Sequence, residues 1–233
     1  KEPKRRVLDL DILHAERSSV LLKCDLVTDM VNEFPDLQGI MGGYYAKAQG
    51  EDDEVALAIK DQYKPAFSGD NIPSTDLGKL LSIADKMDTL CGIFAVGKKP
   101  TGNKDPFALR RASLGIIKIL QESKLAINIY ELIEFSVNQI AIEGLDKKQI
   151  RTEVEDFINQ RLKHNYLEQG ISHDVVDAVM DLKPQNLTDC NERILACEEF
   201  KNDISAPALA AANKRISNIL KKSEESIPDK VTL

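Results

Sequence analysis

The sequence predicts an all-α protein. Apolar residues recur at three- and four-residue intervals along almost the whole chain, and no stretch shows the sustained alternation of a half-buried strand. The 233 residues suffice for one or two domains. Hydrophobic residues at 42% and charged residues at 30% are ordinary proportions for a folded chain, and they exclude disorder over the whole length.

Two helical stretches and a loop are expected before residue 75. The helical stretches cover residues 15–31 and 37–48, and the pair Phe34-Pro35 interrupts the pattern between them. Residues 64–74, KPAFSGDNIPS, concentrate Pro, Gly, Ser and Asn and are expected to form a loop.

The most regular helix is expected between Ser74, a suitable N-cap, and Gly97. Its buried stripe consists of Leu77, Leu80, Leu81, Ala84, Met87, Cys91 and Phe94. The next helix has a marked start, because Asp105 can cap it and Pro106 suits its first position. Further helices are expected at 128–142, 146–168, 173–181, 188–202 and 205–222.

The charge distribution is uneven. The chain has a formal net charge of −7 and a pI near 5.2, which excludes a general nucleic-acid coat protein. Residues 98–118 nevertheless hold six basic residues against one Asp, and residues 201–222 hold five against one Asp. This segregation favours a local anionic partner, although solvated helix faces give the same pattern.

The most informative basic segment is VGKKPTGNKDPFALRRASLG, residues 96–115. Three of its lysines lie in a Gly/Pro loop that leads into the start of a helix, where free N–H groups and the positive dipole end attract phosphate. Two arginines follow on that helix. The predicted contacts to an RNA backbone are Lys98, Lys99, Lys104, Arg110 and Arg111. The alternative is a charged fringe beside a packed apolar stripe.

No nucleotide-binding or catalytic motif stands out in the sequence. Gly39, Gly42 and Gly43 fit neither GxGxxG nor GxxxxGK[ST], no serine stands in GxSxG, and the three histidines are isolated. We therefore expect no catalytic residue in this chain.

The cysteines and the hydropathy indicate an ordinary cytoplasmic protein. The four cysteines, at positions 24, 91, 190 and 197, lack CxxC spacing and are expected to be free thiols in a reducing compartment. No apolar run approaches the length of a membrane helix, so no membrane partner is expected. Because the chain begins without Met and stops soon after a helix, we expect a piece of a longer protein.

Four positions resemble the ligand set of the HD superfamily of metal-dependent phosphohydrolases. His14 matches the first ligand, Cys24 and Asp25 match the His-Asp pair, and Asp85 matches the last ligand. The thiol at position 24 departs from the pattern, because hard divalent cations prefer oxygen or imidazole ligands. We expect a degenerate HD site without metal, and an HD-type phosphohydrolase remains the alternative function.

Three longer strings carry a more specific resemblance. They are LLKCDLVTDMVNEFPDLQGIMGGYYA, LSIADKMDTLCGIFAVGKKPTGNKDPFALRRASLGI and PALAAANKRISNILKKS. Together they are similar to the β subunit of bacterial heterotetrameric glycyl-tRNA synthetases, over about residues 12–228.

This resemblance implies a function and a set of partners. In the family, the α subunit forms glycyl adenylate with ATP and magnesium, and the β subunit is needed for binding and charging tRNA. The resemblance therefore implies a non-catalytic fragment that positions tRNA(Gly) for a glycine-tRNA ligase, with the α subunit and the rest of β as partners and no cofactor of its own. A helical scaffold that contacts only protein is a further alternative.

The resemblance also implies a domain order. An HD-like helical domain is expected at 1–125, a second, smaller helical module at 126–204, and the start of a C-terminal anticodon-binding domain at 205–233. Lys214 and Arg215, in the last of these regions, become further candidates for tRNA binding.

Overall fold

The computed structural model describes residues 7–220, and within them the chain is all-α, as predicted. This part contains eleven α-helices and two short 3-10 helices, and its only β-type pairs are two isolated bridges. The α-helices are α1 (Ile12–Leu21), α2 (Asp29–Glu33), α3 (Ile40–Ala48), α4 (Asp53–Asp61), α5 (Asp76–Ala95), α6 (Leu109–Glu122), α7 (Ile129–Gln139), α8 (Lys147–Glu168), α9 (His173–Met180), α10 (Leu187–Lys201) and α11 (Ala206–Leu220). The 3-10 helices are η1 (Cys24–Val27) and η2 (Pro35–Leu37). No helix between residues 7 and 220 is both long and apolar enough to cross a bilayer.

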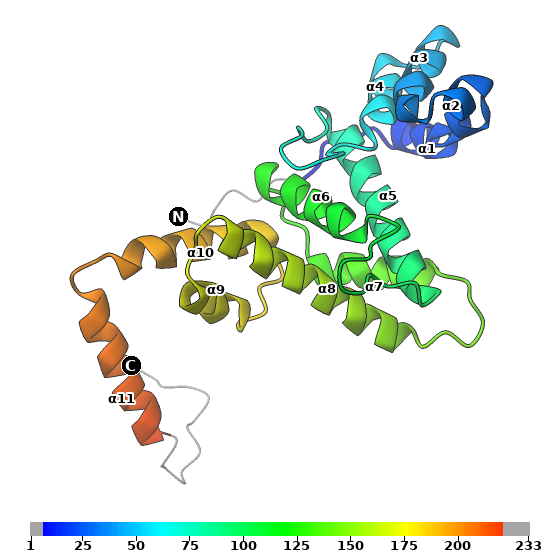
Figure 1. The fold of residues 1–233 in the computed structure, drawn as a ribbon. Coiled ribbons are helices and arrows are strands. Elements are labelled where there is room, and N and C mark those ends of the chain that lie inside the picture. The colour runs from blue at the N-terminus through cyan, green and yellow to red at the C-terminus, as the bar shows by residue number, and fades with distance from the viewer. Residues whose placement is uncertain (1–6, 221–233) are drawn as a thin grey trace.

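Two packed bodies share the long helix α5 (Figure 1). In the first, which we call the N-terminal body, α1 to α4 pack together, and α1 and α4 contact the first half of α5, with Ala58, Leu77 and Leu81 in one apolar cluster. In the second, the C-terminal body, the rest of α5 packs with α6 to α10 around one continuous hydrophobic cluster that runs from Ile83 to Ile194. The 20 residues of α5 give it a length of about 30 Å, enough to serve both bodies.

Local hydrogen bonds place the start of α5. The hydroxyl of Thr75 accepts the N–H of Gly78 at 3.0 Å and is the N-cap, one residue after the predicted Ser74. Ser74 instead donates both its N–H and its hydroxyl to the buried carboxylate of Asp61, at 3.2 and 3.1 Å. The loop that precedes α5 is thereby fastened to the end of α4.

A buried lysine joins α4, α5 and the loop between them. The Lys86 ammonium on α5 donates to the carbonyl oxygens of Gln62, Tyr63 and Lys64 at 3.4, 3.3 and 3.0 Å and lies 2.7 Å from the Ser82 hydroxyl. These carbonyls end α4, where a cation also complements the negative end of the helix dipole. We call this arrangement the Lys86 clamp.

Glycine at position 115 makes room for the clamp. A Cβ added to Gly115 on α6 would lie 2.9 Å from Cε and 3.1 Å from Cδ of Lys86. The aliphatic part of the lysine therefore crosses α6 at a point where no side chain projects. The Lys86 clamp thus connects the N-terminal body, α5 and α6.

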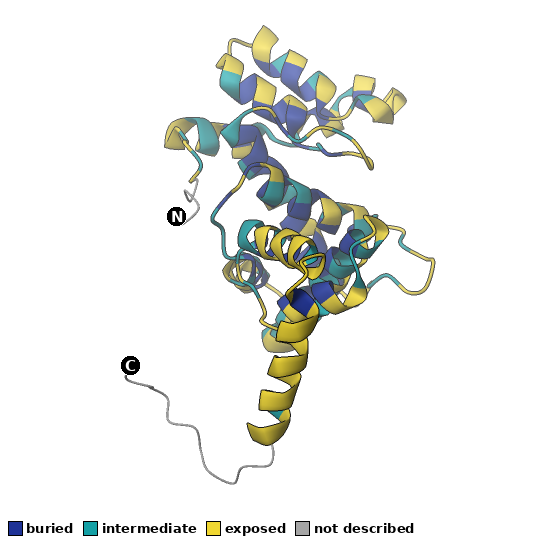
Figure 2. Ribbon diagram, turned by 90° about the vertical axis from the view of Figure 1, so that its left-hand side faces the viewer, coloured by how far each residue is buried: buried dark blue, intermediate teal, exposed yellow. Residues whose placement is uncertain are grey.

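The C-terminal helix stands apart from both bodies. Ala206 is the one buried residue of α11, and the rest of the helix is largely exposed (Figure 2). Its apolar residues Leu209, Ile216 and Ile219 are 60, 55 and 60% exposed. No apolar face of α11 is therefore covered by the described part of the chain.

Most helices beyond α5 follow the sequence prediction, with ends shifted by one to three residues. The predicted domain limits at residues 125 and 204 stay predictions. The hydrophobic cluster of the C-terminal body continues across residue 125, because α6 shares it with α7 to α10. The divide between packed bodies that the structure shows lies instead along α5. The predicted helix over 205–222 is confirmed to Leu220, and its last two residues lie outside the described part.

The predicted continuous helix at 15–31 is wrong. The chain leaves α1 after Leu21, passes through η1 and enters α2 at Asp29. Thr28 explains the break, because its hydroxyl donates to the carbonyl of Asp25 at 2.7 Å and accepts the N–H of Val31 at 3.4 Å. Helix α3 begins at Ile40 rather than at residue 37, since Gly39 before it has φ of +75°.

Two further differences concern α4 and α6. Helix α4 was not expected, although Asp52 caps it and Val55, Ala56 and Ile59 are buried on one face. Helix α6 begins at Leu109, three residues after the predicted Pro106, because Ala108 takes the left-handed conformation with φ of 53°.

We predict that Lys86→Met lowers the free energy of unfolding at pH 7 by about 1–3 kcal/mol, because buried carbonyls lose their donor. Chemical denaturation measures the change. Lys148→Met, at an exposed residue of α8, is the control and should change stability by less than about 0.5 kcal/mol. A Lys86→Met chain as stable as the native chain would show that the clamp does not stabilise the fold.

We also predict a specific pH dependence of this group. Burial lowers the pKa of Lys86 from 10.5 to about 8, so between these values the unfolded chain binds more protons than the folded chain. The contribution of Lys86 to stability therefore rises as the pH increases from 8 towards 10.5. Denaturation at pH 7 and at pH 9.5 should show the native chain gaining stability relative to Lys86→Met. A difference that shrinks at the higher pH would contradict this.

Candidate nucleic-acid interface

The predicted basic segment forms a tight loop between α5 and α6. Thr101 and Lys104 exchange two backbone hydrogen bonds, of 3.0 and 2.8 Å, and Gly102 between them has φ of +50°. Exposed Lys98 precedes this turn, with its ammonium 5.9 Å from the centre of the Phe107 ring. Lys104 is exposed, and no side chain in the described residues pairs with it. Lys98 and Lys104 are therefore open to an anion.

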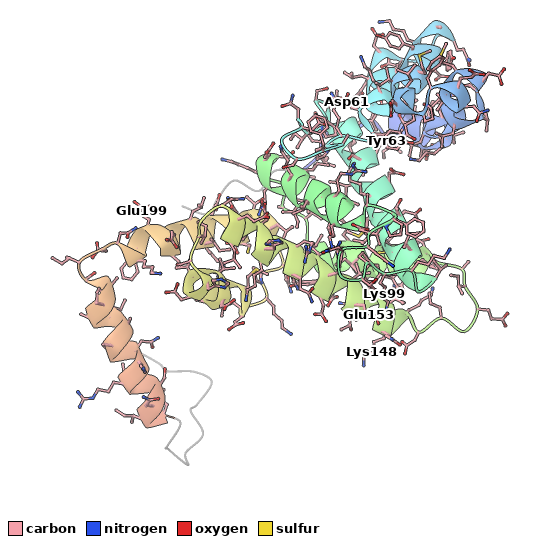
Figure 3. All side chains as sticks on the ribbon, viewed as in Figure 1. Asp61, Tyr63, Lys99, Lys148, Glu153 and Glu199 are labelled. Carbon is pink, nitrogen blue, oxygen red and sulfur yellow. The ribbon has the colours of Figure 1, made fainter. Side chains whose placement is uncertain are left out.

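Two of the five predicted contacts are engaged by the protein itself. Lys99 forms an ion pair with Glu153 on α8, and this hydrogen bond lowers the pKa of that carboxyl (Figure 3). Arg110 donates from Nη2 to the carbonyl of Gly102 at 2.5 Å. Lys99 and Arg110 thus hold the loop in place.

The predicted phosphate site at the helix start is wrong. The Asp105 carboxylate accepts the N–H groups of Leu109 and Arg110, both at 2.9 Å. These are the free donors on which the prediction depended, and a carboxylate already occupies them. Any anion bound at this loop must therefore be held by side-chain cations.

Arg111 lies on another face of α6. It is exposed and has no ion pair or hydrogen bond within residues 7–220. A guanidinium on this helix could in principle pair with a carboxylate of α5 such as Asp85 or Asp88, but neither pair forms. Asp85 instead lies 2.7 Å from the Lys23 ammonium. Arg111 is the guanidinium of the basic segment that remains available.

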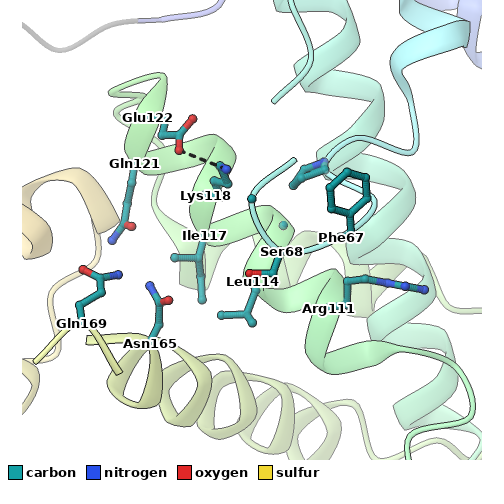
Figure 4. A pocket seen from close by; sticks show the side chains of 13 residues that line it. Phe67, Ser68, Arg111, Leu114, Ile117, Lys118, Gln121, Glu122, Asn165 and Gln169 are labelled. Atoms are coloured by element: carbon teal, nitrogen blue, oxygen red, sulfur yellow. Dashed lines mark ion pairs between the residues drawn. The ribbon is translucent and has the colours of Figure 1, made fainter. Parts of the chain in front are cut away.

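Arg111 lines a groove of about 530 Å³ between residues 65–69, α6 and α8 (Figure 4). We call it the amide groove, because three carboxamides meet at one end of it. Leu114 and Ile117 line its middle. Its polar side chains are Ser68, Arg111, Lys118, Gln121, Asn165 and Gln169, with Glu122 beside Lys118.

The second basic island divides at the limit of the described residues. Lys214 and Arg215 are exposed on α11, and no ion pair forms between them and the described part of the chain. Lys201 pairs with Asp174 at 2.9 Å and lowers the pKa of that carboxyl to about 2. Lys221 and Lys222 lie outside the described residues.

Each of the four side chains at the degenerate HD positions contacts a different group of the protein. Nδ1 of His14 is 2.9 Å from the Glu54 carboxylate, which raises the pKa of the imidazole. Cys24 is exposed, with its thiol 3.6 Å from the carbonyl of Val20.

The two carboxylates of this set are also engaged. Asp25 is buried and accepts the N–H of Gly39 at 2.5 Å through one oxygen, while its other oxygen has no partner. Asp85 binds Lys23, whose ammonium also lies 4.3 Å from the centre of the Tyr63 ring. Among the described residues no three His, Cys, Asp or Glu side chains are grouped to hold a metal ion. The residues present do not fit an HD metal centre.

Sequence reasoning missed the amide groove and the Lys86 clamp. Gln121 lies on α6, more than forty residues in sequence from Asn165 on α8 and Gln169 at the C-cap of α8, and none stands in a motif. The one available signal was Lys86 within the apolar stripe of α5, where a charge requires internal partners.

The sequence matches the family model described as glycyl-tRNA synthetase beta subunit over residues 4–181. The glycine–tRNA ligase beta subunit of Photorhabdus laumondii is 47% identical over 221 residues, 95% of this chain and 32% of the relative. That of Methylobacillus flagellatus is 48% identical over 213 residues, 91% of this chain and 30% of the relative. The beta subunit of Escherichia coli strain E24377A is 45% identical over 221 residues. The chain thus spans about a third of the length of these curated relatives.

We predict that Cys24→His does not create a metal site. The substitution restores the imidazole of the HD pattern, but His14 stays bound to Glu54 and Asp85 to Lys23. After incubation with manganese or zinc and gel filtration, elemental analysis should find no stoichiometric metal in either the native or the variant chain. An HD phosphohydrolase treated in the same way is the positive control. Retention of one metal ion per chain, lost on Asp85→Ala, would overturn the prediction.

Proposed function

This chain belongs to the glycyl-tRNA synthetase beta-subunit family, and we propose that it supplies part of the surface on which a glycine-tRNA ligase holds tRNA(Gly). One observation supports this role above the others. Lys98, Lys104 and Arg111 are exposed cations that form no ion pair within residues 7–220, on a chain with a net charge of −7. Such cations attract an anion to one place on the protein, and the negative charge of the rest of the chain repels the anion elsewhere.

In this proposal the chemistry of glycylation takes place elsewhere in the enzyme. The α subunit binds ATP and magnesium and forms the adenylate, and the rest of β and the α subunit are the protein partners of this chain. The complex acts in the cytoplasm, where it meets tRNA. This chain binds no cofactor and contributes position rather than catalysis.

The exposed cations are suited to phosphates rather than to bases. Lys98 and Lys104 are flexible point charges on a loop, and contacts of this kind orient a nucleic acid without reading its sequence. The anticodon is therefore read outside the loop. Lys214 and Arg215 on α11, which stands apart from both bodies, are a second and separate pair of exposed cations.

An HD-type phosphohydrolase is not favoured. The four positions that would hold its metal are bound to other groups, and Asp25 and Asp85 serve the packing of the N-terminal body. A scaffold that contacts only protein remains the competing outcome, and it predicts that no RNA binds.

We predict that Lys98→Ala and Lys104→Ala each weaken binding of glycine tRNA and lower the salt slope, log K against log salt, by somewhat under one unit, about 0.7–0.9. Lys99→Ala and Arg110→Ala should lower the melting temperature and change the slope less, because the protein itself engages these two side chains. Titrations of the chain with tRNA(Gly) at several salt concentrations, beside melting curves, measure both effects.

Lys148→Ala is the matched control, since it removes an exposed lysine from the start of α8 and should leave the slope unchanged. An equal fall for all five variants, control included, would show that only net charge matters. No change for Lys98→Ala and Lys104→Ala would exclude the loop as a tRNA contact.

A further inference from the structure

We propose that the amide groove binds one unpaired nucleotide, with its phosphate at Arg111 and its base at the carboxamides of Gln121, Asn165 and Gln169 (Figure 4). This inference rests on the proposed function, because an RNA is the source of nucleotides that the chain would meet in that role. It adds a site for a single base to a surface that is otherwise proposed to contact only the phosphate backbone of the RNA.

The groove has the size and the lining of a site for a small ligand. Its volume of about 530 Å³ lies within the usual range of roughly 300–1,000 Å³ for such sites. Leu114, 37% exposed, forms a short apolar strip between the polar ends, and Ile117 on the same helix is buried. Phe67, 63% exposed, adds an aromatic side chain from the wall formed by residues 65–69. A flat base can cover this strip.

The carboxamides have unused hydrogen-bonding capacity. No hydrogen bond of the Asn165 or Gln169 side chain forms within the described chain. The Gln121 amide nitrogen donates to the Tyr166 hydroxyl at 2.8 Å and to the Leu187 carbonyl at 3.4 Å. A carbonyl can only accept, so the nitrogen of Gln121 faces Leu187 and its oxygen remains as an acceptor. The three side chains therefore offer donors and acceptors together.

This mixture distinguishes a nucleotide from a simple anion. A phosphate or an acidic peptide would use only the N–H donors and the positive charge, and would leave the acceptor oxygens of the carboxamides without a partner. The edge of a base carries both donors and acceptors, as does a carboxamide. An unpaired base is required, because pairing uses the edge that these amides would bind.

The charges in the groove are arranged for one phosphate. Lys118 donates to the carbonyl of Asp70 at 2.6 Å and lies 3.6 Å from Glu122, so it neutralises that carboxylate and holds the loop. Arg111 has no such partner within residues 7–220. A guanidinium offers paired donors to phosphate oxygens, which makes Arg111 the phosphate ligand.

The wall formed by residues 65–69 is fixed before any ligand binds. The Asp70 carboxylate accepts the N–H of Ala66 at 2.7 Å, and Lys118 holds the carbonyl of Asp70 from α6. The Lys86 clamp fastens the residue that precedes this loop, Lys64. A preformed groove binds with less loss of conformational entropy.

The test uses this chain labelled with nitrogen-15 and two sources of nucleotide. Adenosine, guanosine, cytidine and uridine monophosphates represent the free nucleotide, and a short single-stranded RNA represents the strand. At least one probe should shift the side-chain amide signals of Asn165 and Gln169 and leave those of Asn32, an exposed residue of α2, unchanged. Shifts with monophosphates alone identify a free nucleotide as ligand, and shifts with the strand alone identify RNA.

Variants separate the base from the phosphate. Asn165→Ala should weaken binding of the shifting probe about three- to tenfold without changing the salt slope, because a neutral hydrogen bond is lost. Arg111→Ala should weaken binding and lower the slope by somewhat under one unit. Asn32→Ala and Lys148→Ala, matched in residue type or charge, should do neither.

Three results would overturn the inference. They are equal binding of the single strand and of the same RNA annealed to its complement, equal competition by polyglutamate, and no effect of Asn165→Ala. Even if one of these results were obtained, a lower salt slope of tRNA binding in Lys98→Ala would still support the proposed function. Conversely, the side-chain amide signals of Asn165 and Gln169 could shift while Lys98→Ala and Lys104→Ala leave the salt slope of tRNA binding unchanged. That result would support nucleotide binding in the groove and contradict the proposed tRNA surface.

Discussion

The Lys86 ammonium is the interaction on which the arrangement of the two bodies depends. It gathers the carbonyls at the end of α4 and at the start of the following loop, and it does so from the middle of the helix that both bodies share. Burial of a charge is costly, so such a group persists only where several acceptors surround it. Here the acceptors belong to the junction itself. The same contact fixes the entry to the wall of the amide groove, which links the packing of the N-terminal body to the candidate binding site.

The helices that the sequence predicted well are those set by apolar periodicity. In α5 five of the seven residues of the predicted stripe are buried, because three- and four-residue spacing places them on one face whatever the tertiary contacts are. Leu80 is only half-buried and Ala84 is exposed, since the buried face runs through Ile83 and Leu90 instead. The ends and breaks were predicted less well. Thr28 uses its side chain to satisfy backbone groups and breaks the predicted helix, and the left-handed conformation of Ala108 moves the start of α6 by three residues. Such competition is decided by local geometry that composition does not reveal.

The candidate interface shows a different limit of sequence reasoning. Five basic residues looked equivalent along the chain, but Lys99 meets a carboxylate on α8 and Arg110 meets its own loop. The partner of Lys99 is set by how α8 packs against the end of α5, and that of Arg110 by the turn within its own loop, and the charge pattern of the sequence reveals neither. The amide groove was harder to predict, since its carboxamides come together only when α6 packs against α8. The family resemblance, by contrast, was readable in full, because it rests on strings of identical residues rather than on packing.

The shared helix has a mechanical consequence. Side chains of the first half of α5 are interlocked with α1 and α4, and those of its second half with α6, α7 and α8, so neither body can slide along it. The remaining way to reorient one body against the other is to bend α5 near its middle, which is where Lys86 stands. Torque applied to the N-terminal body by a neighbouring protein would therefore strain that lysine first. The strain would then pass through residues 64 and 65 into one wall of the groove and change its width.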